Sequence, residues 1–174
     1  MTRRARWIGV GTPESASLPA LCERLAQTQA RDADPIVIWG KASSHVCLGE
    51  GADAVWVDEG QHVFVLIVPL RFAPGRPRRW IAWALAPAIA VCRGLGVRAY
   101  FEGRDLWVAG RKAAGAGCAT IGACAVIVSS LPRAFTGGLP VARRLREAIE
   151  AQFGWQFETS WPNPEERQAM GEAG

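Results

Sequence analysis

Short apolar or β-branched segments that come in pairs constrain the fold of this chain more than any other feature. The segments 35–40 and 45–49 flank the turn-like sequence KASS, and the segments 54–57 and 62–70 flank DEGQ. Each pair predicts a β-hairpin, because short runs of this kind separated by turn residues are typical of neighbouring antiparallel strands. Further strands are expected at 97–102, 105–110 and 124–131.

Apolar residues at helical spacing predict three helices, at 18–30, 79–95 and 139–154. The apolar run inside the second helix is too short to span a bilayer, which takes about 20 residues, so we expect a buried helix and no membrane segment. Paired strands with few helices favour an α+β fold, with a mixed, largely antiparallel sheet packed by these helices. We predict one domain over residues 1–174, with a core at about 18–157 and a polar C-terminal tail, 162–174, that frays.

Charge and cysteine content limit the partners of such a domain. The net charge of +4 comes from scattered arginines without a zinc-finger or RNA-recognition signature, so no nucleic acid partner is expected, although an acidic partner or a phosphate-bearing ligand fits. Five cysteines without a CxxC spacing predict reduced thiols in a cytoplasmic protein. His45, His62 and Cys47 lack the spacing of metal ligands, and no metal site is predicted.

Lys112 is the most informative single residue. The chain has 20 lysines and arginines, but only Lys41 and Lys112 are lysines, and Lys112 stands in the sequence DLWVAGRKAAG between Gly110 and Gly115. The residue has two interpretations: a solvated side chain at the tip of a hairpin, or a compact point charge that holds a small anionic group.

Three stretches of the chain resemble the biotin/lipoate protein ligase superfamily, whose catalytic domain is shared by lipoate–protein ligases, octanoyltransferases and biotin–protein ligases. The first stretch, VIWGKASSHVCLGE (37–50), is similar to the family's strand–turn–strand. The second, AVWVDEGQ (54–61), resembles the lipoate-ligase segment A-V-[FY]-H-D-x-G-N. The third, DLWVAGRKAAG (105–115), resembles N-D-[IL]-x-V-x-G-[RK]-K-[IL]-[AS]-G and is the most specific match. The resemblance covers about residues 35–157.

The resemblance implies a mechanism. Ligases of this family join the carboxylate of lipoate or biotin to the α-phosphate of ATP, and then pass the acyl group to a lysine of a lipoyl- or biotinyl-carrier protein. The resemblance also implies that Lys112 is the catalytic residue that binds the acyl carboxylate and the adenylate, and that Asp105 helps to hold metal or nucleotide. The implied ligands are ATP with Mg²⁺ and lipoate, octanoate or biotin, with lipoate favoured by the second stretch. The residues implied to bind them are Gly49, Gly51, Asp58, Gly60, Asp105, Gly110 and Gly115.

The sequence departs from the family in the segment before AVWVDEGQ. Relatives that form adenylates carry a loop R-R-x-x-G-G-G there, whereas this chain keeps only Gly51, with the acidic residues Glu50 and Asp53 beside it. Val57 stands at the usual histidine position, and Arg104 replaces the asparagine before Asp105. Negative charge at a phosphate site is electrostatically unfavourable, so the alternative is a non-catalytic pseudoenzyme of the same fold that binds a ligand or a protein.

The octanoyltransferase branch uses a cysteine nucleophile in a C-G pair beyond the lysine motif. The comparable place in this chain reads SLPRAFTGGLP and contains no cysteine. Cys118 and Cys124 follow Lys112 too closely, and Cys124 begins an apolar strand that predicts an inert thiol. Acyl transfer through cysteine is therefore disfavoured. The tryptophans Trp39, Trp56 and Trp107 fall on the three family-like stretches and are candidates to line a pocket for an apolar acyl chain.

Overall fold

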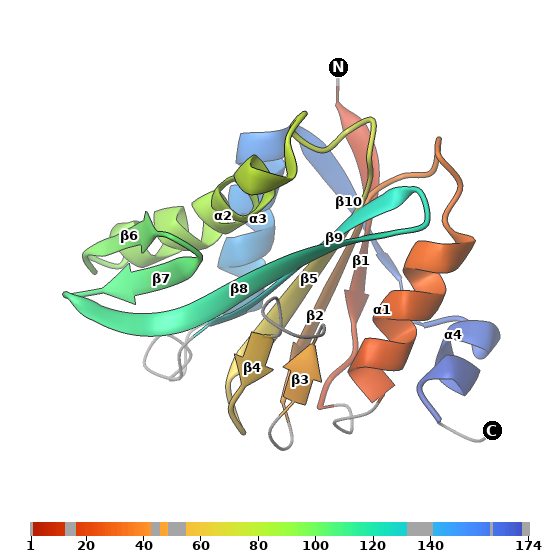
Figure 1. Cartoon of the computed structure of the whole chain (residues 1–174), viewed down its shortest axis with the longest axis horizontal. Helices are drawn as coiled ribbons and strands as arrows, with labels where there is room; N and C mark the ends of the chain where they lie inside the picture. The colour runs from red at the N-terminus through yellow and green to blue at the C-terminus, as the bar shows by residue number, and fades with distance from the viewer. Residues whose placement is uncertain are drawn as a thin grey trace.

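The computed structural model describes residues 2–12, 17–42, 46–48, 55–131, 141–160 and 162–171, and its centre is a mixed sheet of eight strands (Figure 1). The strands are β1 (Arg3–Gly9), β2 (Ile36–Lys41), β3 (Val46–Leu48), β4 (Val55–Val57), β5 (His62–Pro69), β6 (Ala99–Glu102), β7 (Asp105–Val108), β8 (Arg111–Ile121), β9 (Cys124–Leu131) and β10 (Trp155–Ser160). The helices are α1 (Ser17–Thr28), α2 (Trp80–Gly94), α3 (Val141–Phe153) and α4 (Pro164–Ala169), and a 3₁₀ turn, Pro77–Arg79, leads into α2.

Strands in the large sheet lie in the order β10-β1-β2-β5-β9-β8-β7-β6, while β3 and β4 form a separate two-stranded sheet. The strand β1 runs parallel to both of its neighbours, and the other pairs are antiparallel. The α+β fold with a largely antiparallel sheet is confirmed.

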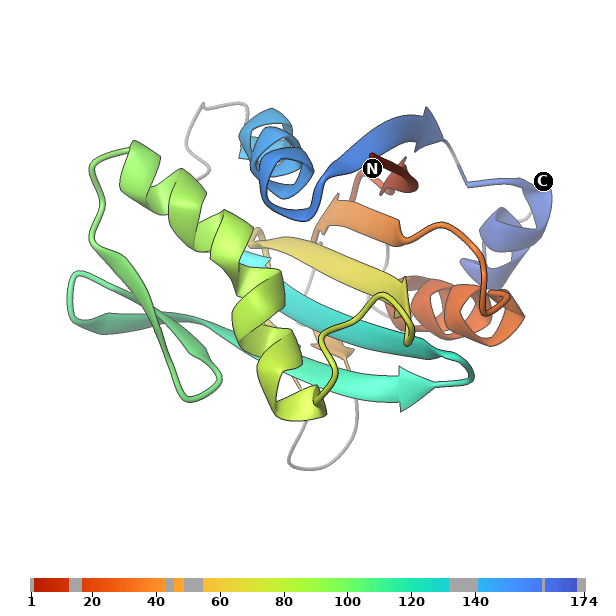
Figure 2. The ribbon, with the colours of Figure 1, turned by 90° about the horizontal axis from the view of Figure 1, so that it is seen from above.

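The two faces of the sheet bury two separate cores. Alternate residues of β5 point to opposite faces: Phe64 and Leu66 join α2 and α3, and Val65 and Ile67 join α1 and the β3–β4 hairpin. Figure 2 shows α2 and α3 side by side on one face, away from α1 and α4. All three helices predicted from the apolar spacing are present as α1, α2 and α3.

The strand pairs predicted for the two hairpins are wrong. The strand β2 pairs with β5, and β3 pairs with β4, so the hairpin predicted within each pair of segments is absent. Two backbone hydrogen bonds link the chain where it leaves the large sheet for the small one and where it returns, and we call this link the neck. Ala42 N–H donates to the Gln61 carbonyl at 2.9 Å, and Gly60 N–H donates to the Ala42 carbonyl at 2.8 Å. Strands β2 and β5 have buried residues on both faces and therefore belong in the centre of the large sheet, which the short β3 and β4 do not enter.

Three strands were not predicted: β1, β8 and β10. The sequence of β8, RKAAGAGCATI, is rich in alanine and glycine, which are depleted in strands. Its small residues have a packing role, since Ala114 and Ala116 are buried in the core beneath α2. Strand position here follows from tertiary packing rather than from local propensity.

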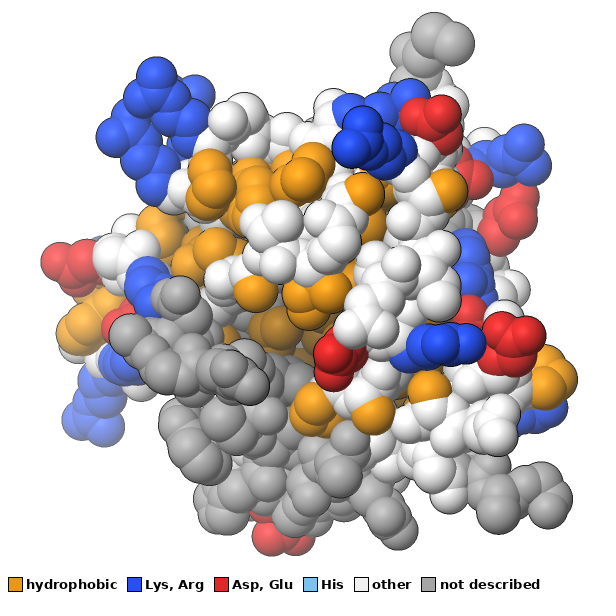
Figure 3. Space-filling view, turned by 45° about the vertical axis from the view of Figure 1, so that its right-hand side comes forward, with side chains coloured by type: hydrophobic (Ala, Val, Ile, Leu, Met, Phe, Trp, Pro, Cys, Tyr) orange, Lys and Arg blue, Asp and Glu red, His pale blue; other side chains and the backbone are white. Residues whose placement is uncertain are grey.

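On the face of the molecule seen in Figure 3, apolar side chains gather near the middle, and lysine and arginine side chains stand in several separate places around them. The basic side chains of the described residues that this view shows are thus distributed in separate places. In the part of the chain that the structure describes, no helix is long and apolar enough to cross a membrane.

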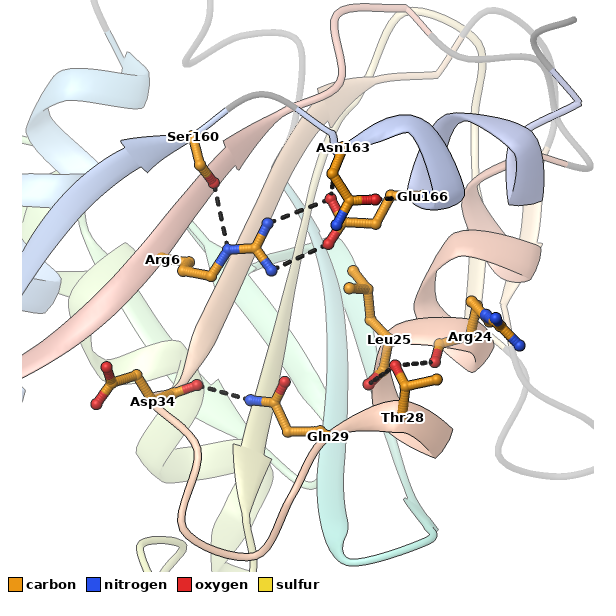
Figure 4. A network of polar contacts seen from close by, with 9 residues as sticks. All are labelled: Arg6, Arg24, Leu25, Thr28, Gln29, Asp34, Ser160, Asn163 and Glu166. Atoms are coloured by element: carbon orange, nitrogen blue, oxygen red, sulfur yellow. Dashed lines mark hydrogen bonds and ion pairs between the residues drawn. The ribbon is translucent and has the colours of Figure 1, made fainter.

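The expectation that the C-terminal tail frays is wrong for α4. Glu166 in this helix accepts hydrogen bonds from Arg6 of β1, with Nη1 to Oε1 at 3.0 Å and Nη2 to Oε2 at 3.2 Å (Figure 4). Asn163 caps the helix, because its side chain accepts from Glu166 N–H and its own N–H donates to the Glu166 carboxylate. The last helix is therefore anchored to the first strand and packs beside α1.

Candidate functional site

The site begins at the hairpin formed by β7 and β8. Its two-residue turn, Ala109 and Gly110, has positive φ at both positions, 49° and 79°, which is the pattern of a type I′ turn. This turn places Lys112 near the start of β8, beside β7. Gly110 thus has a conformational role that accounts for its glycine.

Lys112 forms an ion pair with Asp105, with Nζ 2.9 Å from Oδ1. The two residues come from different strands of the hairpin, so β7 and β8 together bring the lysine and aspartate of the third family-like stretch into contact. Lys112 is therefore an ion-paired strand residue just beyond the turn and not the tip of the hairpin.

Asp105, Trp107, Lys112 and Gly115 share one face of this hairpin. Asp105 and Trp107 are two residues apart on β7, and a Cβ added at Gly115 would lie 3.7 Å from Asp105 Oδ1. The intervening Leu106 pairs with Ala114 and is buried in the core under α2. The site face is thus the opposite face of the sheet, on which β4 packs against β8 and β9.

The ion pair is accessible to solvent. The side chain of Lys112 is 58% exposed and that of Asp105 is 27% exposed. Exposed ion pairs contribute only about 0–1 kcal/mol to stability, so little free energy is needed to separate these two groups. An anionic ligand can compete with Asp105 for the ammonium group.

The turn after β4 contains two further predicted residues, Asp58 and Gly60. Gln61 N–H donates to the Asp58 carbonyl at 3.0 Å, and Gly60 has a φ of 77°, which the turn requires. Asp58 is exposed, and Gly60 is buried in the neck between the two sheets. The remaining predicted residues, Gly49 and Gly51, lie outside the described residues, as do Glu50 and Asp53.

Sequence reasoning named Trp107 only as a candidate wall of a pocket. The structure places it directly opposite Lys112, at a bulge where the register between β7 and β8 shifts. The indole lies nearly parallel to the ring of Tyr100 on β6, with centroids 6.3 Å apart. Trp39 lies on the other face, where it stacks against Trp7 and His62, and does not join this site.

Cysteine and metal chemistry find little support among the described residues. Burial raises the pKa of the Cys124 thiol, so it is a poor nucleophile, as its place in an apolar strand predicted. No group of three His, Cys, Asp or Glu side chains within the described ranges could hold a metal ion. One surface hollow among these residues lies elsewhere, between α2 and α3 beside Arg143 and Arg144.

Comparison with known proteins gives one family match. Residues 49–133, just under half of the chain, match the model of the lipoyl protein ligase A/B catalytic domain. This range contains β4, the β7–β8 hairpin and every described residue of the predicted site. No curated protein matches the sequence.

Solved structures match over the whole fold. A bi-partite lipoate protein ligase of Thermoplasma acidophilum, studied with its E2 lipoyl domain, superposes with a TM-score of 0.77 at 12% identity and covers 98% of this chain and 91% of its own. A T. acidophilum protein with bound lipoic acid also gives 0.77 at 12% identity, covering 97% and 94%. The biotin acetyl coenzyme A carboxylase synthetase of Helicobacter pylori, with bound biotinylated ATP, gives 0.59 at 15% identity, covering 86% and 75%.

At these identities the structural matches establish the fold, and the family match adds the segment that carries the site. The resemblance of the three sequence stretches to the biotin/lipoate protein ligase superfamily is thereby confirmed, by a family match over residues 49–133 and by the fold of the whole chain.

Proposed function

We propose that this protein binds lipoate or octanoate, with the ligand carboxylate paired to the Lys112 ammonium group. The observation that carries this proposal is the solvent-accessible Lys112–Asp105 pair on the face of β8 that bears Gly115. A lysine in this position offers a compact charge that either carboxylate or phosphate oxygens can approach. Glycine beside it leaves room for a ligand where any larger side chain would project.

The carboxylate of the ligand would replace Asp105 as the partner of Lys112. A hydrogen bond to a charged group contributes about 1.5–3 kcal/mol, which exceeds what the exposed protein pair contributes. The T. acidophilum structure that matches this fold contains lipoic acid, which supports a ligand of this class. The second sequence stretch, AVWVDEGQ, favours lipoate over biotin.

Activation by ATP and transfer to the lysine of a carrier protein would complete a ligase reaction. The charge of Lys112 suits the carboxylate and the α-phosphate that react in such a step. Asp105 is the carboxylate that contacts Lys112 among the described residues and could contribute one ligand to Mg²⁺, with the phosphates of ATP holding most of the ion. A carrier domain fits a basic chain of net charge +4, and the T. acidophilum ligase was studied with such a lipoyl domain. Five cysteines without a CxxC spacing fit a cytoplasmic protein with reduced thiols.

The second candidate function is binding without catalysis. Its support is the sequence at 50–53, where acidic residues and a single glycine replace the basic, glycine-rich loop of adenylate-forming relatives. A pseudoenzyme would keep the acid-binding half of the site and lack the half that binds phosphate.

Calorimetric titration with lipoate, octanoate and biotin, each with and without Mg-ATP, tests the proposal. We expect the wild-type chain to bind lipoate and Lys112→Ala to weaken binding about 10- to 100-fold, the equivalent of one charged hydrogen bond. Arg111→Ala is the matched control: it removes an adjacent exposed charge that pairs across from Val108, on the other face, and should change affinity less than about twofold. Asp105→Asn should tighten binding of lipoate alone, because it removes the competing carboxylate.

The outcomes separate the two functions. Lipoate binding that strengthens with Mg-ATP, followed by a lipoyl mass gain on an added lipoyl domain, establishes a ligase. Lysine-dependent binding without any effect of ATP establishes the pseudoenzyme. If none of the three acids gives a heat of binding, both versions of the proposal are contradicted.

A further inference from the structure

A buried hydrogen-bond donor without a partner lies in the candidate site. Among the described residues, two buried side-chain nitrogen atoms have no hydrogen-bond partner, His62 Nδ1 and Trp107 Nε1. Buried polar groups in folded proteins are nearly always paired, because an unpaired group loses its hydration and gains nothing in return. Each exception therefore calls for an explanation.

Trp107 lies where a ligand of Lys112 would bind. Trp107 and Lys112 pair directly across β7 and β8, and both belong to the face that carries Asp105. The β-bulge at this point of the hairpin adds one residue to β8, and bulges commonly re-aim the side chains beside them.

Two side chains that flank the indole, Tyr100 and Lys112, are themselves open to solvent. Tyr100 pairs with Trp107 across β6 and β7, and its ring lies at 14° to the indole plane, which holds the orientation of Trp107. Tyr100 is 38% exposed, and the Lys112 side chain is more exposed still. Because Nε1 is buried, a ligand that reaches it has to displace a covering group, and these two flanking side chains are open enough to solvent to move.

We infer that the Trp107 indole N–H is a second donor to the carboxylate that pairs with Lys112. One carboxylate oxygen would contact the lysine ammonium, and the other would accept from Nε1. This inference rests on the proposed function and adds to it a residue that positions the acid group. In the unliganded chain the indole donor is unpaired, and ligand binding supplies the missing acceptor.

The variant Trp107→Phe tests the inference because it keeps an aromatic ring beside Tyr100 and removes the N–H donor, together with one ring of the indole. We expect this variant to bind lipoate and octanoate about 5- to 30-fold more weakly and to lose less thermal stability than Trp80→Phe, in which the same change of ring also breaks a hydrogen bond. A purely structural role predicts the reverse: reduced thermal stability with unchanged affinity.

Trp80→Phe is the matched control. The Trp80 indole donates to the Pro74 carbonyl at 2.7 Å, so loss of this hydrogen bond should lower stability and leave affinity unchanged. Trp107→Phe should thus act mainly on affinity, and Trp80→Phe should act on stability alone.

The indole N–H signal of Trp107 in a ¹H–¹⁵N spectrum, assigned by its absence in Trp107→Phe, reads the contact directly. We expect a downfield shift on titration with octanoate and no such shift with 1-octanol, which has the same chain length and no carboxylate. A Trp107 signal that stays in place while octanoate binds in a Lys112-dependent manner overturns the inference and leaves the proposed function standing. Absence of any binding overturns both.

Discussion

Lys112 and Asp105 contact each other at 2.9 Å, yet more than half of the lysine side chain is open to solvent. A pair with this exposure adds about 0–1 kcal/mol to stability at most, so the fold does not depend on it. Loss of Lys112 should therefore change ligand binding while the melting temperature stays nearly constant. The binding experiments with Lys112→Ala can then be interpreted without correction for unfolding.

His62 should make the stability of the protein depend on pH. Burial lowers its pKa from 6.5, and the positive charge of Lys41, its partner across β2 and β5, lowers the pKa further. The unfolded chain therefore takes up a proton at a higher pH than the folded chain. Stability contributed by neutral His62 is complete above pH 6.5 and is lost as the pH falls through that value towards the lower pKa of the folded state.

The variant His62→Phe, which keeps a ring against Trp39, measures this effect. We expect the free energy of unfolding of the wild type to fall more steeply than that of the variant between pH 7 and pH 5, and the two slopes should differ by less than about 1.4 kcal/mol per pH unit, the limit for one proton. Parallel melting curves over this range would contradict the assignment.

At the scale of an element, the turn of the β7–β8 hairpin contains a residue whose backbone conformation is unfavourable for its type. Ala109 adopts a φ of 49°, which costs a residue with a Cβ about 1–2 kcal/mol and which asparagine tolerates better. Ala109→Asn creates the Asn-Gly sequence preferred in type I′ turns. We expect it to raise stability by about 0.5–1 kcal/mol and the melting temperature by about 1–4 °C.

Gly110→Ala, which adds a Cβ at a φ of 79°, is the opposing variant and should lower the melting temperature. Thermal unfolding of both variants checks this pair of predictions. If both shift the melting temperature in the same direction, the turn is not the type I′ turn described above.

At the scale of the whole molecule, the Arg6–Glu166 pair joins residues 160 positions apart in the sequence. The Glu166 side chain is 6% exposed, and removal of Arg6 would leave this buried carboxylate without a positively charged partner, with only the Asn163 N–H still donating to it. We expect Arg6→Met to lower the free energy of unfolding by about 2–4 kcal/mol, somewhat less than for a fully buried pair because the arginine is partly exposed.

Arg4→Met is the control from the same strand. Arg4 pairs with Glu158 at 3.8 Å with both side chains largely exposed, and its loss should cost less than about 0.5 kcal/mol. Denaturant unfolding of the two variants measures the difference. Equal losses would show that Glu166 finds other partners when Arg6 is absent.

Sequence patterns predicted those features that depend on neighbours along the chain. The apolar spacing of Leu18, Leu21 and Leu25 predicted α1, and that of Val141, Leu145 and Ile149 predicted α3, because one helical face must be buried. The third family-like stretch likewise pointed to Lys112 and Asp105, which lie in one hairpin.

Features that depend on distant partners could not be predicted. Val37 and Cys47 both stand in apolar strand segments, and nothing local shows that the first enters the large sheet while the second pairs with Trp56 in the small one. The unpaired state of the Trp107 donor is equally invisible in sequence, since it depends on every atom around the indole. In the sequence, Glu166 is one of several charged residues of the C-terminal tail, and nothing near it indicates that Arg6 is its partner.

The position of β1 between β2 and β10 affects how this protein is made. β1 is synthesised before β10, and Ser160 of β10, which hydrogen-bonds to Arg6 of β1, lies 154 positions after it. During translation β1 can pair with β2, while its other edge, with unpaired backbone groups, waits for β10 to leave the ribosome. A nascent or truncated chain that lacks β10 therefore presents an open strand edge to its neighbours, and this edge is where we expect association between incomplete chains to begin.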